Sequence, residues 1–420
     1  MPALTTPPLA LYVHFPWCVR KCPYCDFNSY TLTGELPEQA YLGRLTRDLA
    51  AQAPQVAGRE VTSVFLGGGT PSLFSPRSIG ELLAAARRQL SVAADLEVTL
   101  EANPGAIERG AFREYRAAGV TRVSLGAQSF DQAGLSALGR IHSPAETRRA
   151  AEELHAAGLD NFNLDLMYAL PGQDVAAALR DVTEALALSP GHLSHYQLTL
   201  EPGTLFAARP PPLPDEDAAA AMLDGCAALL AQAGFARYEV SAYARAGRQC
   251  RHNLNYWTFG DYLGVGAGAH GKLTFPQRAR IVRTVQLREP RRYLAAADEA
   301  LVRRVIPARE LPFEFMLNAL RLTGGFDAQL FAARTGLDWR EIAAPVEAAI
   351  TRGLIVRTAT GLRPSELGLR FLNDVLLGFM PETPKFTELP ALSIGVSGSA
   401  RCGLYSQDRG ALSENESITG

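Results

Sequence analysis

Short β-branched apolar runs alternate with amphipathic stretches rich in Ala, Leu and Arg from the start of the chain to about Ala233. Six runs have the length and composition of buried strands: Leu9–Phe15, Val61–Leu66, Leu96–Leu100, Arg122–Gly126, Asn161–Met167 and Leu193–Leu200. Between and after them, apolar residues recur at three- and four-residue spacing, which predicts helices near 38–53, 77–90, 108–118, 144–157, 175–187 and 216–233. Right-handed crossovers would curl such an α/β sheet into a partial (β/α)6 TIM-like barrel.

The pattern changes after residue 288 to helices without intervening strands, at 290–304, 309–321, 326–334 and 339–352. A hairpin at 353–358 and 361–364, followed by a helix at Ser365–Leu377, predicts a winged-helix-like module. We therefore divide the chain into a core domain (1–240), a connecting segment (241–288), a smaller, mostly helical C-terminal domain (289–384) and a polar, Gly/Ser-rich tail (385–420) that we expect to be disordered.

Polar and glycine motifs follow the predicted strands. A cysteine loop follows the first strand, and the next segments are GGGTP (67–71), EANP (101–104), QSF (128–130) and DLMY (165–168). Because the carboxyl ends of barrel strands converge at one mouth, we expect these segments to form a single ligand site.

Cys18, Cys22 and Cys25 form a CxxxCxxC triplet. Three thiolates on one loop hold three irons of a [4Fe–4S] cube and leave the fourth iron open to a small molecule. Zinc is the competing interpretation, but it needs a fourth donor, for which His14 is the only close candidate. A disulfide would leave the third cysteine over, so we rank the cluster first.

The cysteine spacing resembles the radical S-adenosylmethionine (SAM) superfamily, in which the open iron chelates SAM. A longer pattern carries a more specific resemblance: YxHxPxC from Tyr12, then GGGTP, EANP, QSF, GRIH (139–142) and NLDLMYALPGQ (163–173). It resembles the oxygen-independent coproporphyrinogen III dehydrogenase family over nearly all of residues 9–380. This resemblance implies that Tyr24 packs beside the cluster and that SAM is contacted by Tyr12, Gly68, Gly69, Thr70, Glu101, Gln128, Arg140 and Asp165.

The chemistry of these residues supports the roles in SAM binding, and it also allows a purely structural role for each of them. Glu101 and Asp165 emerge from apolar strands, where an unpaired carboxylate is costly, so they either contact a ligand or form salt bridges to a neighbouring helix. Arg140 suits a carboxylate as a charge-assisted donor, although a single arginine is more often a solvated surface residue. A lone glycine run such as Gly67–Gly69 is most often only a turn.

One departure separates this chain from the dehydrogenases, which have a fourth cysteine two positions after the third. Here the loop continues Cys25-Asp26-Phe27, and Phe27 has no sulfur to ligate iron or donate hydrogen. This continuation and the HNxxY motif at His252–Tyr256 resemble instead the HemW heme chaperones, a branch that is thought to bind heme and deliver it to acceptor proteins.

His252 and Tyr256 have a chemical rationale of their own, because imidazole and phenolate are both heme-iron ligands. Cys250 and His270 are alternative ligands, and the aromatic residues at 256–262 either stack on a porphyrin or simply form core. We read the glycine-rich segment 264–270 as a tight turn, because it lacks the full context of a dinucleotide loop.

Composition and charge indicate which partners and which compartment to expect. The chain has 420 residues, a formal net charge of −2 and no apolar run of transmembrane length, which favours neither nucleic acid nor membrane as a partner. The N-terminus lacks signal-peptide features, and Cys226, Cys250 and Cys402 are dispersed, so we expect a cytoplasmic protein with reduced thiols. The expected partners are heme, an acceptor protein and an electron donor such as a flavodoxin or ferredoxin. The main alternative function is that of a coproporphyrinogen III dehydrogenase. A radical SAM enzyme that acts on RNA is a weaker alternative.

Overall fold

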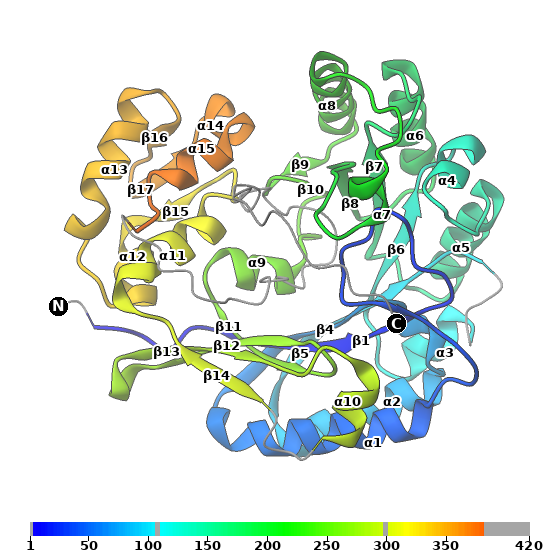
Figure 1. The fold of residues 1–420 in the computed structure, drawn as a ribbon, viewed down its shortest axis with the longest axis horizontal. Helices are drawn as coiled ribbons and strands as arrows, with labels where there is room; N and C mark the ends of the chain where they lie inside the picture. Colours follow the sequence, from blue (N-terminus) through cyan, green and yellow to red (C-terminus); the bar gives the residue numbers. More distant parts are fainter. Residues whose placement is uncertain (1–2, 106–109, 297–300, 382–420) are drawn as a thin grey trace, which may run out of the picture.

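The computed structural model describes residues 3–105, 110–296 and 301–381 (Figure 1). The main sheet has the strand order β14-β13-β12-β11-β1-β4-β5-β6-β7-β8-β10-β9. The six predicted strands are confirmed as parallel neighbours in chain order: β1 (Leu9–Phe15), β4 (Glu60–Gly68), β5 (Ser91–Ala102), β6 (Arg122–Gln128), β7 (Phe162–Tyr168) and β8 (His192–Gln197).

Helices follow these strands on the outer side of the sheet, as Figure 1 shows. They are α1 (Glu38–Gln52), α2 (Pro76–Gln89), α3 (Phe112–Ala117), α4 (Gln132–Ala137), α5 (Pro144–Ala156), α6 (Val175–Ala187) and α8 (Glu216–Gln232). The single turn α7 (Leu205–Ala208) lies instead beside the cysteine loop, where Phe206 N donates to the carbonyl oxygen of Pro23. The short α4 and α7 were not predicted. Capping side chains define where several helices begin. Ser143, one residue before Pro144, accepts a hydrogen bond from Glu146 N at the start of α5, and Asp174 and Asp215 cap α6 and α8 in the same way.

The two faces of the sheet differ in chemistry because successive strand residues point to opposite sides. Leu11, Val64, Leu100, Leu125 and Leu164 belong to the apolar core that the outer helices cover. The alternating positions on the inner face are largely polar and still buried: Ser63, Glu97, Thr99, Arg122, Ser124, Asn163, Asp165, His192 and Ser194. A polar barrel interior therefore lies behind the mouth.

The connecting segment adds strands that the sequence did not predict. β11 (Asp261–Val265) pairs in parallel with β1, and β12 (His270–Phe275), β13 (Arg280–Val285) and β14 (Val302–Val305) continue antiparallel from it. The expected turn is present between β11 and β12, at residues 266–269. The opposite edge gains β10 (Ala242–Ala244) and β9 (Ala236–Arg237).

The predicted helix at 290–304 is wrong in its second half. Among the residues of this range that the structure describes, Pro290–Ala295 form α10, and residues 302–305 form the edge strand β14 in place of the helix. The β-branched residues Val302 and Val305 favour a strand, and pairing with β13 satisfies the backbone of this segment on one side. Local periodicity alone did not reveal this pairing.

The C-terminal region combines helices with a small sheet. It contains α11 (Leu311–Ala319), α12 (Ala328–Thr335), α13 (Arg340–Thr351), β16 (Ile355–Arg357), β17 (Gly361–Pro364), α14 (Glu366–Arg370) and α15 (Leu372–Leu377). The hairpin is confirmed; β15 (Phe326–Asp327) adds a third strand, and the expected helix from Ser365 to Leu377 is interrupted at Phe371. The proposed tail, residues 385–420, lies outside the described residues.

Buried ion pairs connect this region to both edges of the main sheet. Arg283 of β13 pairs with Glu314 of α11 at 2.5 Å, and Arg321 pairs at 3.0 Å with Glu239, next to β10. Helix α9 (Arg251–Trp257) lies on the inner side, near the centre of Figure 1, and packs on β4 and β1. In the described part of the chain, no helix has the length and apolar character needed to cross a bilayer.

Candidate functional site

The loop that carries the cysteines is closed at its base by a short strand pair. β2 (Trp17–Cys18) and β3 (Tyr30–Thr31) run in parallel, and the loop lies between them. Lys21 folds back over the loop, where its Nζ donates to the carbonyl oxygens of Phe27 at 3.2 Å and Ser29 at 2.9 Å. The three thiols are thus presented by a compact loop at the end of β1.

The three cysteines are free thiols and only partly exposed. Burial raises the pKa of Cys18 to about 11, with further contributions from Cys25 and Cys22, and burial likewise raises the pKa of Cys25. Thiols in such a setting become thiolates when a cationic metal group compensates their charge. The donor set therefore fits a [4Fe–4S] cluster held by Cys18, Cys22 and Cys25.

Zinc fits less well. His14, the expected fourth donor, uses Nδ1 for Tyr12 Oη at 2.9 Å and Nε2 for the carbonyl oxygen of Asn28 at 2.9 Å. Burial also lowers its pKa to about 4, so the ring is neutral with both nitrogens engaged. Within the described residues, no group of three or more His, Cys, Asp or Glu side chains is arranged to hold a single metal ion.

Arg140 lies beside the cysteine loop and not in solvent. Its Nη1 is 3.7 Å from Cys22 Sγ, and its Nη2 donates to the carbonyl oxygen of Gly126 at 2.8 Å and to Asn103 Oδ1. Burial by itself would lower the pKa of Arg140, but the neighbouring Tyr24 and Cys22 raise it above its usual range. The guanidinium is therefore a fixed positive charge at the mouth.

The glycines after β4 are required by their surroundings. Gly68 has φ +115°, and a Cβ there would lie 2.5 Å from the His14 ring; a Cβ on Gly69 would lie 2.5 Å from the carbonyl oxygen of Trp17. Gly68 N donates to Glu101 Oε2 at 2.8 Å, and Asn103 Nδ2 donates to Thr70 Oγ1 at 3.1 Å. The GGGTP and EANP segments therefore form one connected surface.

Asp165 of β7 and Gln128, the last residue of β6, are the remaining side chains expected to contact SAM. Asp165 accepts hydrogen bonds from Asn163 Nδ2 at 2.8 Å and Ser124 Oγ at 3.1 Å, while burial raises its pKa. Gln128 has φ +65°, and its Oε1 accepts from Tyr196 Oη at 2.9 Å. Among the described residues, the fold thus brings the glycine segment, Glu101, Gln128 and Arg140 to the mouth with the cysteine loop, while Tyr12 and Asp165 lie at the middle of β1 and β7.

The HNxxY motif lies on a buried helix and not on a loop. His252 and Tyr256 lie on α9, and they are only 2% and 5% exposed. The His252 ring lies 4.9 Å from Phe65 and 5.0 Å from Tyr256; its Nδ1 is 3.2 Å from Ser63 Oγ, and its Nε2 has no hydrogen-bond partner. Access of a porphyrin to this imidazole therefore requires α9 to move.

The neighbouring candidates are buried as well. Tyr256, Trp257 and Tyr262 form an apolar cluster with Leu322, so the core interpretation of these aromatics is confirmed for this conformation. Cys250 Sγ lies 3.7 Å from Glu97 Oε1, and burial raises the pKa of this thiol to about 12, which keeps it neutral. His270 lies on β12.

Sequence analysis missed several inward-facing polar residues that support the site. Asn103, Ser124, Asn163, His192 and Tyr196 hold the expected contacts in place. Their signal was present as polar residues at alternate positions of otherwise apolar strands, such as Asn163 and Asp165 in β7.

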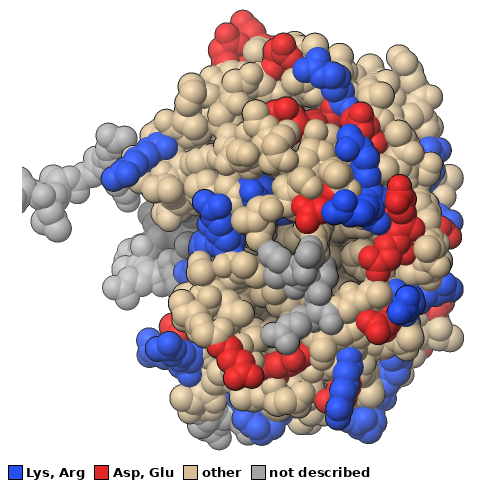
Figure 2. Space-filling view, turned by 90° about the vertical axis from the view of Figure 1, so that its right-hand side faces the viewer, with Lys and Arg blue, Asp and Glu red and all other residues tan. Residues whose placement is uncertain are grey.

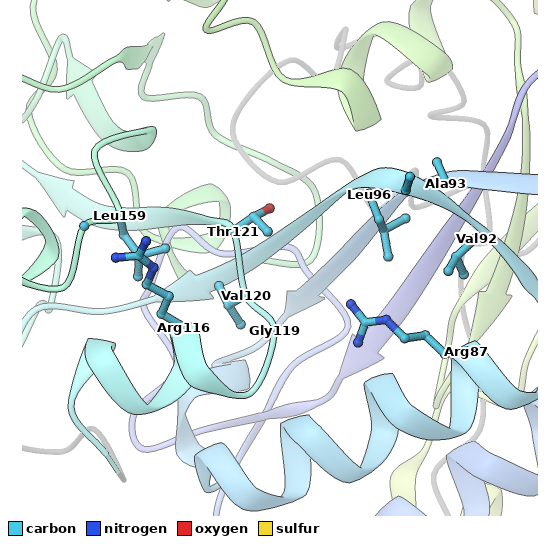
Figure 3. Close-up of a pocket in the computed structure, with 11 residues that line it drawn as sticks. Arg87, Val92, Ala93, Leu96, Arg116, Gly119, Val120, Thr121 and Leu159 are labelled. Carbon is cyan, nitrogen blue, oxygen red and sulfur yellow. The ribbon is translucent and has the colours of Figure 1, made fainter.

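A shallow pocket of about 620 Å³ lies at the opposite, amino-terminal ends of β5 and β6 (Figure 3). Arg87 and Arg116 lie on it among small and apolar residues, and none of the lining residues is His, Cys, Met or Tyr. This pocket therefore offers no heme-iron ligand and is separate from the cysteine loop.

Comparison with known proteins agrees with this geometry. The Radical SAM superfamily model matches residues 12–182, and the HemN C-terminal domain model matches residues 306–371. Coproporphyrinogen III oxidase (HemN) from Escherichia coli has the same fold, with a TM-score of 0.75, 22% sequence identity and coverage of 89% of this chain and 90% of that one.

Full-length relatives carry a consistent description. "Heme chaperone HemW" of Escherichia coli (strain K12) is 48% identical over 381 residues, which span 90% of this chain and 99% of that protein. "Heme chaperone HemW" of Haemophilus influenzae is 46% identical over 386 residues, spanning 91% and 100%. The mitochondrial "Radical S-adenosyl methionine domain-containing protein 1" of Mus musculus is 37% identical, spanning 89% and 87%. With this identity over nearly the whole length of these relatives, the chain belongs to the HemW heme chaperone family of the radical SAM superfamily.

Proposed function

We propose that this protein binds heme and transfers it to an acceptor protein, and that its core holds a [4Fe–4S] cluster and SAM. The observation that carries the heme part is the His252 imidazole, which is neutral because burial lowers its pKa to about 3 and whose Nε2 has no hydrogen-bond partner. A neutral imidazole with an unused nitrogen is a competent heme-iron ligand once α9 exposes it.

Cys18, Cys22 and Cys25 hold the cluster in this proposal, and Tyr24 packs beside it. The SAM contacts are Tyr12, Gly68, Gly69, Thr70, Glu101, Gln128, Arg140 and Asp165. A bound cluster and SAM would supply one-electron chemistry at the mouth. The residues of this chain bind and orient: Arg140 faces an anionic group, and Glu101 and Asp165 accept hydrogen bonds from amino or hydroxyl groups.

Phe27 supports the chaperone over the dehydrogenase alternative. It occupies the position of the extra cysteine in the dehydrogenases, and the carbonyl oxygen of Phe27 accepts hydrogen bonds from Lys21 and from the backbone of Ser29. A phenyl side chain at this position has no sulfur to take part in hydrogen transfer. We therefore expect no conversion of coproporphyrinogen III by this protein.

The test combines a heme titration with an anaerobic assay that contains coproporphyrinogen III, SAM and a reductant. We expect a Soret band that His252→Ala weakens or shifts, and no decarboxylated product. His155→Ala is the matched control, because this partly exposed histidine lies on α5 and bonds to Asp160 at 2.8 Å. Robust product formation would instead favour the dehydrogenase, and a spectrum indifferent to His252 and Tyr256 would move the ligand to Cys250 or His270.

The SAM site has its own test in Asp165→Asn, which keeps the shape and removes the charge. A hydrogen bond to a charged group contributes about 1.5–3 kcal/mol, so we expect the Kd for SAM to rise by about 10- to 150-fold. The Kd for SAM is measured by equilibrium binding to protein that has its full iron and sulfide content. Asp160→Asn, on the protein surface, should leave the Kd unchanged. Unaltered SAM affinity in Asp165→Asn would remove Asp165 from the site.

An acidic one-electron donor such as a flavodoxin or ferredoxin is the proposed source of reducing power. The outer face of the cysteine loop exposes Val19, Arg20 and Lys21, and the neighbouring Ile141 and Leu205 are also exposed. Apolar residues with a basic border suit an acidic protein partner.

Nucleic acid is not among the proposed partners. On the face shown in Figure 2, the described Lys/Arg and Asp/Glu side chains are interspersed instead of forming one large basic patch. The five described cysteines are free thiols, so the proposal places the protein in a reducing compartment such as the cytoplasm.

A further inference from the structure

A continuous chain of buried hydrogen bonds joins the expected SAM site to the start of α9. Cys250 N, which precedes the helix, lies 3.4 Å from Tyr238 Oη, and Tyr238 Oη lies 2.9 Å from His192 Nε2. His192 Nδ1 is 2.6 Å from Asn163 Oδ1, and Asn163 Nδ2 is 2.8 Å from Asp165 Oδ1. This series of hydrogen bonds crosses the inner face of the barrel from Asp165 to α9.

The direction of every bond in this chain follows from chemistry. The Asp165 carboxylate only accepts, so Asn163 donates to it with Nδ2 and accepts with Oδ1. His192 must then donate from Nδ1, which leaves Nε2 to accept from the Tyr238 hydroxyl. Tyr238 Oη in turn accepts from the backbone N–H of Cys250. Burial lowers the pKa of His192 well below its usual value, in agreement with this single neutral tautomer.

A second link runs between the same two ends. Glu97 accepts from the backbone N–H groups of Arg251 and His252, each at 3.2 Å, and so holds the first turn of α9. The Arg122 side chain is 2% exposed and interacts electrostatically with both Glu97 and Asp165, while its Nε has no hydrogen-bond partner. Glu97 and Arg122 thus hold the first turn of α9 in place, while the hydrogen bonds through His192 and Tyr238 carry a change of contact at Asp165 to Cys250.

We propose that Tyr238 and His192 are positioning residues that couple SAM binding at Asp165 to the release of α9, and so control the access of heme to His252. The inference rests on the proposed function, because it assumes that SAM and heme both bind. SAM hydroxyl or amino groups that engage Asp165 compete with Asn163 for its oxygens, which weakens the hydrogen bonds that lead to Cys250 and favours the release of α9. Coupling of this kind is reciprocal, so heme must alter SAM affinity by the same factor.

The experiment measures the Kd for hemin with and without saturating SAM, on the full chain with its cluster reconstituted anaerobically. In the wild type we expect SAM to change the hemin Kd by about 5-fold or more, which is the lower end of typical allosteric coupling. Tyr238→Phe removes only the hydroxyl that connects Cys250 to His192, and it should bring the ratio of the two Kd values to within about twofold of one.

Tyr243→Phe is the matched control. Tyr243 is also a buried tyrosine, on the adjacent β10, but its hydroxyl has no hydrogen-bond partner, so this variant should keep the wild-type ratio. Cluster content and unfolding midpoint establish that each variant is folded. If Tyr238→Phe fails this check, the same ratio is measured in His192→Phe, which removes both hydrogen bonds of His192 in this series and keeps an aromatic ring.

The possible results separate the two proposals. A wild-type ratio near one with both ligands bound, or a full ratio in Tyr238→Phe, would overturn the coupling and leave the heme chaperone proposal standing. Wild-type protein that binds no hemin would overturn the proposed function and the coupling with it. A structural role alone would lower stability or both affinities and leave the ratio unchanged.

Discussion

Alanine in place of Cys22 should abolish the [4Fe–4S] cluster of the reconstituted protein. Three cysteines on the β2–β3 loop are the clustered thiols, and losing one leaves two protein ligands for a cube that needs three. Iron and sulfide should fall from about four of each per chain, the composition of the cube, to background, and the broad visible absorbance should disappear.

The matched control for Cys22→Ala is Cys226→Ala. Cys226 is a buried free thiol on α8, away from the loop, and its removal should leave the iron and sulfide content unchanged. Stoichiometric zinc with neither iron nor sulfide in the wild type would contradict the cluster assignment altogether. Full cluster content in Cys22→Ala would show that another residue supplies the third ligand.

Asp261→Ala should cause a large loss of stability. This fully buried carboxylate at the start of β11 pairs with Lys272 Nζ at 2.8 Å and Arg59 Nη1 at 2.9 Å, and it accepts from Thr274 N at 2.8 Å. Lys272 is itself 2% exposed, so the substitution leaves a buried ammonium without its counter-ion. Breaking such a pair costs about 3–5 kcal/mol in free energy of unfolding, which urea titration measures.

Asp224→Ala is the control for the ion-pair argument. Asp224 pairs with Arg370 at 2.7 Å, but both side chains are more than half exposed, so the expected loss is about 0–1 kcal/mol. A loss below about 1 kcal/mol in Asp261→Ala would mean that the interior around β11 solvates Lys272 without the carboxylate, and that this cluster does not anchor the sheet extension.

The site was largely predictable because its residues belong to short motifs placed by a repeating pattern. Each motif lies within or directly after the second half of a strand, and parallel strands bring their carboxyl ends together whatever their separation along the chain. Glu101 and Asp165 were therefore expected at one mouth from this pattern, whereas Arg140 was expected beside SAM only from the family resemblance. Their partners Asn103, Ser124 and Asn163 were missed, because no local signal says which inward polar side chains meet.

The sheet extension and the setting of α9 were not predictable in the same way. β11 pairs with β1 across some 250 residues, and its run Asp261–Val265 is only five residues long and leads directly into the glycine-rich segment that was predicted to be a turn. His252 and Tyr256 were expected to be heme ligands, with core packing as the alternative for the aromatics, and α9 buries them against Phe65 and Tyr262. Burial of a helix face depends on what other elements leave uncovered, which composition does not reveal.

The sequence by itself determined the βα alternation and the CxxxCxxC loop, because each depends on residues that are near one another along the chain. Only the tertiary structure decided that the barrel interior is polar and that its hydrogen bonds connect Asp165 to Cys250. The physical reason is that buried polar groups must find partners, and the partners come from strands and loops far apart in sequence.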